Sequence, residues 1–133
     1  MLVLDASCLV ELVTDGQGAE AVRQAIPSSE TMAAPHLVDV EVFGVIRRDH
    51  LRGALDRTAS RLALERLTSW PGERFPHTRL LDRAWELRDT VRGWDAMYVA
   101  LAEALGATLL TLDERLASAP GPRCRIVNPA RLS

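Results

Sequence analysis

The segment DAMYVALAEALGATLLTLD, residues 95–113, constrains the fold more than any other part of this chain. From Ala96 to Leu105 only Glu103 is charged, so the helix predicted here has no polar face wide enough to lie against water. Gly106 is suited to end that helix, and the apolar run that follows it has the length of a strand. A buried helix that leads directly into a buried strand is typical of a parallel sheet covered by helices on both faces.

Strand-like and helix-like patterns alternate along the whole chain. Strands are predicted in MLVL, in TMAA, within PGERFPHT, in TLLTL and in RIV. Helices are predicted within 35–53, where Pro35 takes a first-turn position, and over residues 7–13, 19–26, 55–70, 79–92 and 95–105. Because neighbouring parallel strands need crossover connections, we predict a three-layer α/β/α sandwich around a mainly parallel sheet of about five short strands. At 133 residues the chain has the size of one domain, expected to span residues 1–133.

Composition excludes several classes of protein. All 16 basic residues are arginine, so there is no lysine for a phosphate-binding GK[ST] loop. No apolar run is long enough to span a membrane and no basic leader precedes the first strand, so we expect a cytoplasmic protein with no membrane partner. The two cysteines lack CxxC spacing and are expected to stay reduced. A formal charge of -2 gives no general attraction to nucleic acid, which would need a local basic patch or metal ions.

Four acidic residues occupy positions where an apolar or small residue would be more favourable. Asp5 ends the first predicted strand and Asp113 follows TLLTL, so both are expected in the crevice at the carboxyl ends of the strands. Asp95 begins the buried helix on one stripe with Tyr98, and Glu41 lies on the apolar face of its own helix. We therefore expect the four carboxylates to converge in one crevice.

Each of these acids also has an ordinary structural interpretation. Asp5, Asp95 and Asp113 each stand at a predicted helix start, where an aspartate N-cap is worth about 1 kcal/mol. Glu41 taken alone could be a buried acid paired with an arginine. Its neighbour Asp39 lies about 160° away around the helix and is expected to be solvated. Capping cannot explain all four acids together.

Four like charges in one crevice raise one another's pKa values unless a cation neutralises them. Carboxylate oxygens are hard ligands, and no His or Cys is spaced for zinc, so the predicted cation is Mg²⁺ or Mn²⁺. The chemistry that follows is attack of a metal-activated water on phosphorus. Ser7 and Thr111, each two residues from an acid, are predicted to orient the ligands or the metal-bound waters, and the alternative for each is a local capping hydroxyl.

Three segments carry a resemblance to a known family, namely VLDASCLVELV, PHLVDVEV and WDAMYVALAEALGATLLTLDERL. They resemble the PIN-domain ribonucleases, specifically the VapC type of bacterial toxin, and the resemblance runs from residue 1 to about residue 117. The pattern DAxYVALAE…LLTxD is its most specific part, whereas residues 54–90 carry none of its motifs. By this resemblance Thr111 matches the polar residue before the last acid, and the family's acidic quartet corresponds to Asp5, Glu41, Asp95 and Asp113.

The resemblance implies a Mg²⁺- or Mn²⁺-dependent endoribonuclease that serves as the toxin of a VapBC-type toxin–antitoxin pair. It implies that the acidic quartet is both catalytic and metal-binding, and that the substrate is structured RNA such as tRNA or ribosomal RNA. A cognate antitoxin and a homodimeric assembly are implied in the same way.

Arginines are the candidates for holding RNA phosphates. Arg47, Arg48 and Arg52 lie on one predicted helix, and Arg48 and Arg52 are four residues apart, so they can form a cluster. The alternative is that these arginines lie on solvated helix faces and form ordinary i,i+4 ion pairs. Trp94, which adjoins Asp95, is a candidate to stack on an RNA base.

Two rival functions remain open on the sequence. One is a catalytically inactive PIN-like module that binds RNA or protein, against which the intact quartet argues. The other is a different Mg²⁺-dependent α/β protein, a phosphoaspartate receiver or a haloacid-dehalogenase-type phosphatase. Both of these typically use a lysine near the phosphoryl group, and this chain has none.

Overall fold

The computed structural model describes residues 1–132 and contains a five-stranded sheet. Its strands are β1 (Leu2–Leu4), β2 (Met32–Pro35), β3 (Glu73–Phe75), β4 (Thr108–Leu110) and β5 (Ile126–Val127). They are ordered β3-β2-β1-β4-β5, and every neighbouring pair is parallel. The predicted strands and the parallel sheet are therefore confirmed.

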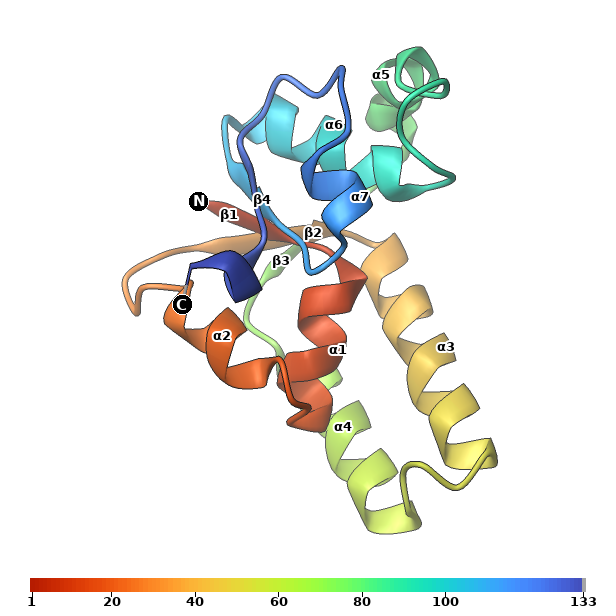
Figure 1. Ribbon diagram of the computed structural model, residues 1–133. Coiled ribbons are helices and arrows are strands. Elements are labelled where there is room, and N and C mark those ends of the chain that lie inside the picture. Colours follow the sequence, from red (N-terminus) through yellow and green to blue (C-terminus); the bar gives the residue numbers. More distant parts are fainter. Residues whose placement is uncertain (133) are drawn as a thin grey trace.

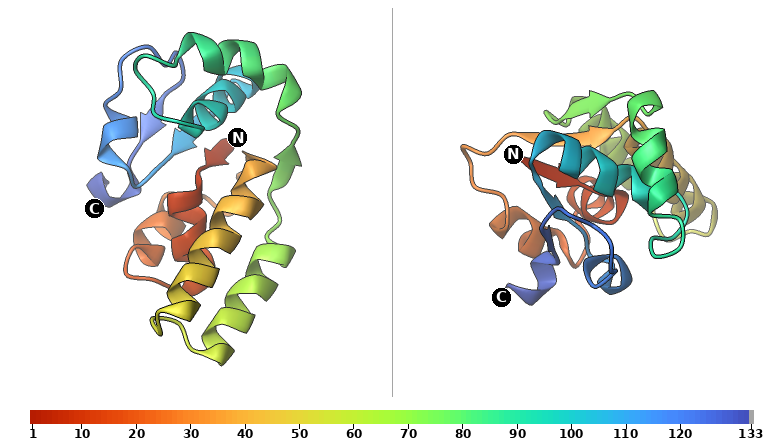
Figure 2. Two further views of the ribbon diagram at one scale, coloured as in Figure 1. Left: turned by 90° about the vertical axis from the view of Figure 1, so that its right-hand side faces the viewer. Right: turned by 90° about the horizontal axis from the view of Figure 1, so that it is seen from above.

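Helices cover both faces of this sheet (Figure 1). One face carries α5 (Leu81–Glu86) and α6 (Asp95–Leu105), and the other carries α1 (Ala6–Thr14) and α2 (Ala19–Gln24). Helices α3 (Leu37–Leu51) and α4 (Arg57–Ser69) pack against α1 and extend away from the sheet as an antiparallel pair (Figure 2). Shorter pieces are α7 (Glu114–Ala117) and the 3-10 turns η1 (Thr78–Leu80) and η2 (Pro129–Arg131). The expected three-layer α/β/α sandwich is confirmed.

The interior of the sandwich is apolar because helices cover the sheet on both sides. Val3 and Leu4 of β1 and Leu109 of β4 are fully buried. Helix α6 lies over β1, β2 and β4, and from Ala96 to Ala102 all its residues except Met97 are buried. This is the burial that its lack of charge predicted. Within residues 1–132 no helix has both the length and the apolar character needed to cross a membrane.

The helix predicted over residues 79–92 is shorter than expected. Helical structure runs from η1 through α5 and ends at Glu86, and residues 87–94 form turns and bends. Leu87 and Val91 are still buried, so a turn segment satisfies the apolar spacing that indicated a helix. Gly93, with a φ of 49°, lies in the left-handed region that glycine adopts without strain, and it leads the chain into α6.

The start of α3 also differs from the prediction. Pro35 is the last residue of β2, and the helix begins two residues later at Leu37. His36 occupies the N-cap position but makes no side-chain capping bond. Instead the Leu37 amide donates a hydrogen bond of 2.8 Å to Nε2 of His77, 40 residues away. A distant histidine thus satisfies one of the amides that every helix start leaves open.

Candidate functional site

The candidate site lies where β1 and β4 end side by side. These strands are neighbours, with Leu4 paired to Leu110, and the chain continues from β1 toward β2 and from β4 toward β5 on the opposite side. A crevice forms at the carboxyl edge of a sheet where strand order reverses in this way. Asp5 follows Leu4 directly, and its amide donates to the Leu110 carbonyl at 3.2 Å. The paired strand ends therefore bring Asp5 next to Thr111.

Asp5 is buried and held through both carboxylate oxygens. Its Oδ1 accepts hydrogen bonds from the Ser7 hydroxyl at 2.5 Å and from the Cys8 amide at 3.2 Å, so Asp5 caps α1. Its Oδ2 accepts a hydrogen bond of 2.5 Å from the Thr111 hydroxyl. Burial raises the pKa of Asp5, and these hydrogen bonds oppose the rise. Ser7 is therefore no helix cap: its hydroxyl orients Asp5 and accepts a bond of 2.9 Å from the Leu112 amide.

Glu41 reaches the crevice from α3 and is half-buried. Its Oε1 accepts a hydrogen bond of 2.5 Å from the Tyr98 hydroxyl, and its Oε2 accepts one of 2.9 Å from the Trp94 indole N–H. No arginine pairs with Glu41 within residues 1–132, so the buried ion-pair alternative is wrong. Sequence reasoning missed both donors. The available signal was Tyr98, because a phenol on a buried helix stripe needs a hydrogen-bond partner.

Asp95 is the first residue of α6 and points into the crevice without a capping role. Trp94 takes the N-cap position, and no side chain caps this helix. Among residues 1–132 no hydrogen-bond donor reaches the Asp95 carboxylate. Burial, followed by the charges of Asp5 and Glu41 and then that of Asp113, raises the pKa of Asp95 to about 6, against which Arg92 acts weakly.

Asp113 is the exposed member of the quartet and does cap a helix. Its Oδ1 accepts a hydrogen bond of 2.9 Å from the Arg115 amide at the start of α7. Its own amide donates to the Thr111 hydroxyl at 3.0 Å, so this hydroxyl joins Asp5 to Asp113. The capping interpretation is therefore correct for Asp5 and Asp113 and wrong for Asp95.

The four acids act on one another electrostatically without forming a ready-made cage. Their charges appear together among the causes that raise the pKa of Asp95. Across residues 1–132, however, no three His, Cys, Asp or Glu side chains are gathered closely enough to hold a metal ion as they stand. The present arrangement of these side chains therefore does not by itself form a cation cage. Their chemistry suits such an ion, since the set is all carboxylate and Asp95 has no donor to satisfy its charge.

Trp94 lines two of the hollows that adjoin the acids. One, of about 390 Å³, lies between α1 and α3 and includes Glu41, Arg48 and Ser7 in its wall. The other, of about 450 Å³, is lined by Arg92, Gly93, Trp94, Asp95 and Asp113. Because Trp94 lines both hollows, it stands between the one that holds Glu41 and the one that holds Asp95, and it is 61% exposed.

The candidate RNA-binding arginines differ in their surroundings. Arg48 and Arg52 both contact Asp49, at 3.4 and 3.0 Å, so they pair with an acid of their own helix segment, but at spacings of one and three residues and not at the i,i+4 spacing of the alternative. Arg47 is exposed and has no ion pair among residues 1–132. Of the three, Arg48 lines the hollow that contains Glu41.

One further acid of α3 was predicted wrongly. Asp39 is not simply solvated, because Oδ1 accepts from Nη2 of Arg74 at 2.9 Å and Oδ2 from Nε at 3.2 Å. Arg74 is the middle residue of the edge strand β3, so this pair links α3 to the edge of the sheet. The helix periodicity of α3 alone does not reveal such a partner.

Comparisons with known proteins agree with this architecture. The family described as "PIN domain" matches residues 2–122 of the chain. Ribonuclease VapC1 of Mycobacterium tuberculosis is 42% identical over 126 residues, which cover 93% of this chain and 94% of the relative.

Solved structures share the fold at lower identity. A toxin–antitoxin complex from Klebsiella pneumoniae superposes with a TM-score of 0.67 at 20% identity, covering 97% of this chain and 98% of that chain. Mycobacterium tuberculosis VapC20, described as a sarcin-ricin loop cleaving toxin, superposes with a TM-score of 0.65 at 19% identity, covering 89% and 95%. At such identities these likenesses concern the fold alone.

Proposed function

Because this chain belongs to the PIN-domain family, and within it to the VapC-type ribonucleases, we propose that it is an endoribonuclease and the toxin of a toxin–antitoxin pair. The reaction is hydrolysis of a phosphodiester bond in structured RNA such as tRNA or ribosomal RNA. One observation carries the proposal: the half-buried Asp95 has no hydrogen-bond donor among residues 1–132 and lies in the field of Asp5, Glu41 and Asp113. A site of that charge is suited to a cation that binds phosphate.

The proposed cofactor is Mg²⁺ or Mn²⁺, with Asp5, Glu41, Asp95 and Asp113 as its ligands. The donor set supports a hard cation, because it contains carboxylates and neither histidine nor cysteine. Such an ion, when bound, lowers the pKa of water and stabilises negative charge that develops at phosphorus.

The chain's own residues contribute preorganisation and proton handling. Hydroxyls of Ser7 and Thr111 hold the two oxygens of Asp5, so its orientation is set before a ligand binds. Asp95, with a pKa of about 6, is ionised in most molecules at neutral pH and can serve as a ligand or accept a proton. Asp113 uses Oδ1 for its capping bond and keeps Oδ2 available to the crevice.

RNA would approach along the α3 side of the crevice. Arg48, beside Glu41, is the arginine best placed to contact a phosphate next to the acids. Arg47 lies on the same helix and Arg52 at its C-cap, and both extend the positive charge away from the crevice. Structured RNA is supported as the substrate class by the name of VapC20, a toxin that cleaves the sarcin-ricin loop.

Two protein partners belong to the proposal. A cognate antitoxin is supported by the structural likeness to the toxin–antitoxin complex from Klebsiella pneumoniae. A homodimer is supported by Val40 and Phe43 on α3, which are 69% and 52% exposed although apolar. We propose the cytoplasm as the place of action, where the RNA substrate is found.

The proposal is tested by cleavage of a mixture of purified tRNA and ribosomal RNA with Mn²⁺ present. Asp95→Asn and Asp5→Asn should each lower the cleavage rate by at least about 100-fold, because each removes a ligand charge at the centre of the site. Asp82→Asn, which changes an exposed acid of α5 outside the crevice, is the matched control and should cut like the wild type.

Circular dichroism of all four proteins would establish that they are folded. Cleavage by a folded Asp95→Asn protein at the wild-type rate would overturn the enzyme assignment. A wild type that binds RNA without cutting it would favour the inactive binding module instead.

A further inference from the structure

Among the described residues 1–132, Glu41 is the only acid of the quartet whose two carboxylate oxygens both accept hydrogen bonds from side chains distant in the sequence. Both donors belong to residues 94–98. Trp94 donates its indole N–H to Oε2 at 2.9 Å, and Tyr98 donates its hydroxyl to Oε1 at 2.5 Å. Glu41 lies 53 residues before the first donor and 57 before the second, so these bonds are purely tertiary.

The two residues that donate to the Glu41 carboxylate differ in their burial. Tyr98 is fully buried beneath the crevice, and Trp94 is 61% exposed at its rim. A carboxylate has about four lone-pair positions, so two donors leave roughly two for a cation. With one donor on each oxygen, rotation of the Glu41 carboxylate about its terminal bond breaks at least one hydrogen bond.

Neither core packing nor helix capping accounts for the position of Trp94. A largely exposed indole gains little from burial, and Trp94 makes no side-chain capping bond although it is the N-cap residue of α6. Gly93, at a φ of 49°, gives the preceding turn a shape that an ordinary residue adopts only with strain. The local chain is thus built so that the indole N–H faces Glu41.

The same segment carries Asp95. Because Asp95 lies between the two donors in sequence, any rigid placement of residues 94–98 sets Glu41 and Asp95 relative to each other. The two carboxylates are electrostatically coupled, since the charge of Glu41 contributes to raising the pKa of Asp95. A cation shared by both would need their oxygens in a defined arrangement.

We propose that Trp94 and Tyr98 are positioning residues that hold the Glu41 carboxylate so that it shares a divalent cation with Asp95. The inference rests on the proposed function in so far as that function supplies the cation. Partners that orient a metal ligand typically change metal affinity by about 10- to 100-fold when they are removed.

The test measures Mn²⁺ affinity by isothermal calorimetry and cleavage kinetics on the RNA that is cut fastest. Tyr98→Phe keeps the ring and removes the hydroxyl donor, and Trp94→Phe keeps an aromatic ring, smaller than the indole, and removes the N–H donor. Each should weaken Mn²⁺ binding by about 10-fold or more. Both variants should have a lower kcat than the wild type at low Mn²⁺, and the kcat should recover as the Mn²⁺ concentration is raised. The KM for RNA should stay unchanged.

Two further variants separate positioning from other roles. Trp94→Ala should behave like Trp94→Phe, because both lack the indole N–H. The control is Trp85→Phe, which alters an exposed tryptophan of α5 that stacks on Arg88 with 4.5 Å from the guanidinium carbon to the ring centroid, and it should bind Mn²⁺ like the wild type. Because Trp94 is exposed, its variants should fold even if loss of the buried Tyr98 hydroxyl proves disruptive.

The contrary results are distinct. If Trp94→Phe binds Mn²⁺ as the wild type does and only Trp94→Ala raises the KM for RNA, the ring is a stacking platform and the inference is overturned. If the wild type binds Mn²⁺ but cuts no RNA, and Trp94→Phe weakens that binding, the inference stands although the proposed function fails. If the wild type binds no Mn²⁺ at millimolar concentration, the inference fails with its premise.

Discussion

Asp95 shows at the scale of one residue how a carboxylate is left without a hydrogen-bond donor among residues 1–132. At an ordinary helix start an aspartate accepts a hydrogen bond from a backbone amide of the first turn, as Asp5 and Asp113 do. At Asp95 the structure supplies burial and three acidic neighbours instead, and these raise its pKa to about 6. The ionised form is therefore less favourable in the folded protein than in the unfolded chain.

This environment predicts a pH dependence of stability in a metal-free buffer. The pKa of Asp95 is higher in the folded state than its ordinary value of 3.8, so the folded protein binds the proton more tightly than the unfolded chain does. Its contribution to stability is full below about pH 4 and is lost as the pH rises through about 6. Asp95→Asn should therefore melt at a higher temperature than the wild type at pH 7.5, and the two should converge near pH 4.

Thermal melting of both proteins in EDTA from pH 4 to pH 8 measures this difference, with Asp82→Asn as the control. A constant gap between Asp95→Asn and the wild type across that range would mean that Asp95 does not titrate abnormally. Burial also raises the pKa of Asp5, but Asp5 is present in both proteins and cancels to first order in the comparison.

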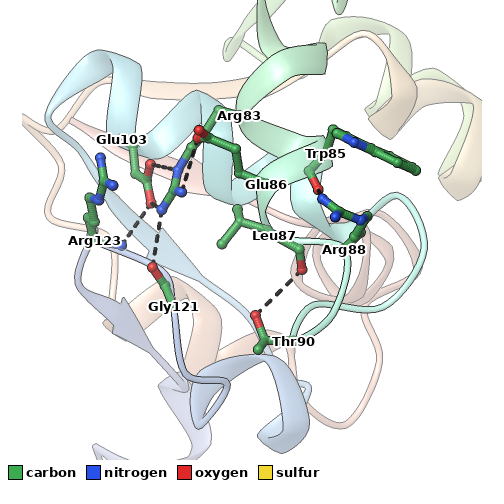
Figure 3. A network of polar contacts seen from close by, with 9 residues as sticks. All are labelled: Arg83, Trp85, Glu86, Leu87, Arg88, Thr90, Glu103, Gly121 and Arg123. Carbon is green, nitrogen blue, oxygen red and sulfur yellow. Dashed lines mark hydrogen bonds and ion pairs between the residues drawn. The ribbon is translucent and has the colours of Figure 1, made fainter.

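At the scale of elements, Glu103 ties α6 to its surroundings (Figure 3). Its carboxylate accepts two hydrogen bonds from Arg83 of α5, at 2.7 and 3.1 Å, and one from the Arg123 amide at 2.7 Å. Arg83 also donates to the Gly121 carbonyl at 3.1 Å. Burial would raise the pKa of Glu103, yet the bonds from Arg83 and Arg123 lower it below its ordinary value. Glu103, the one charged residue from Ala96 to Leu105, thus links α6 to α5 and to the loop before β5.

Removing that charge should weaken the fold. Glu103→Gln should lower the free energy of unfolding by about 2 kcal/mol, because it disrupts charged hydrogen bonds to a carboxylate that is only 13% exposed. The matched control is Glu86→Gln, which pairs with the same arginine at 3.3 Å but is 62% exposed. That control should change stability by less than about 0.5 kcal/mol.

Urea unfolding of the three proteins gives both values. Equal losses for Glu103→Gln and Glu86→Gln would show that the bonds to α6 and to the loop contribute nothing beyond an exposed ion pair.

At the scale of the whole molecule, the fold brings several negatively charged carboxylates together at the carboxyl edge of the sheet. Asp5 and Asp113 arrive there because β1 and β4 are neighbours, and Asp95 arrives because α6 runs back across the sheet toward β4. A ligand that binds only the folded state stabilises it by about 2.7 kcal/mol at a hundredfold excess over its Kd. Cation binding at this edge should therefore stabilise the entire domain.

We expect the Tm of the wild type to rise with Mn²⁺ and to fall again when a chelator is added. Asp95→Asn should lose most of this response, since it lacks a ligand charge and is already relieved of repulsion. Calorimetric scans over a Mn²⁺ series measure both. An identical Mn²⁺ response in the two proteins would place the cation somewhere other than the crevice.

The sequence alone determined the layers of this protein and the residues that could meet at the sheet edge. The spacing of apolar residues is a local property of the sequence, and it indicates which elements are buried. The strands, the buried α6 and the positions of Asp5, Asp95 and Asp113 at element boundaries could therefore be predicted from the order of residues. The length of α5 could not be predicted in this way. Leu87 and Val91 have the spacing of a helix and are buried, but they lie in turns and bends after the helix has ended.

Only the tertiary structure decided which donor each acid meets. Tyr98 and Trp94 donate hydrogen bonds to Glu41, and Arg74 donates to Asp39. His77 accepts a hydrogen bond from the first backbone amide of α3. Each of these contacts joins residues 35 to 57 positions apart, so it depends on how one helix docks on another segment. The sequence pattern of a single helix indicates the face on which a side chain lies, but it does not indicate which residue of another element packs against that side chain.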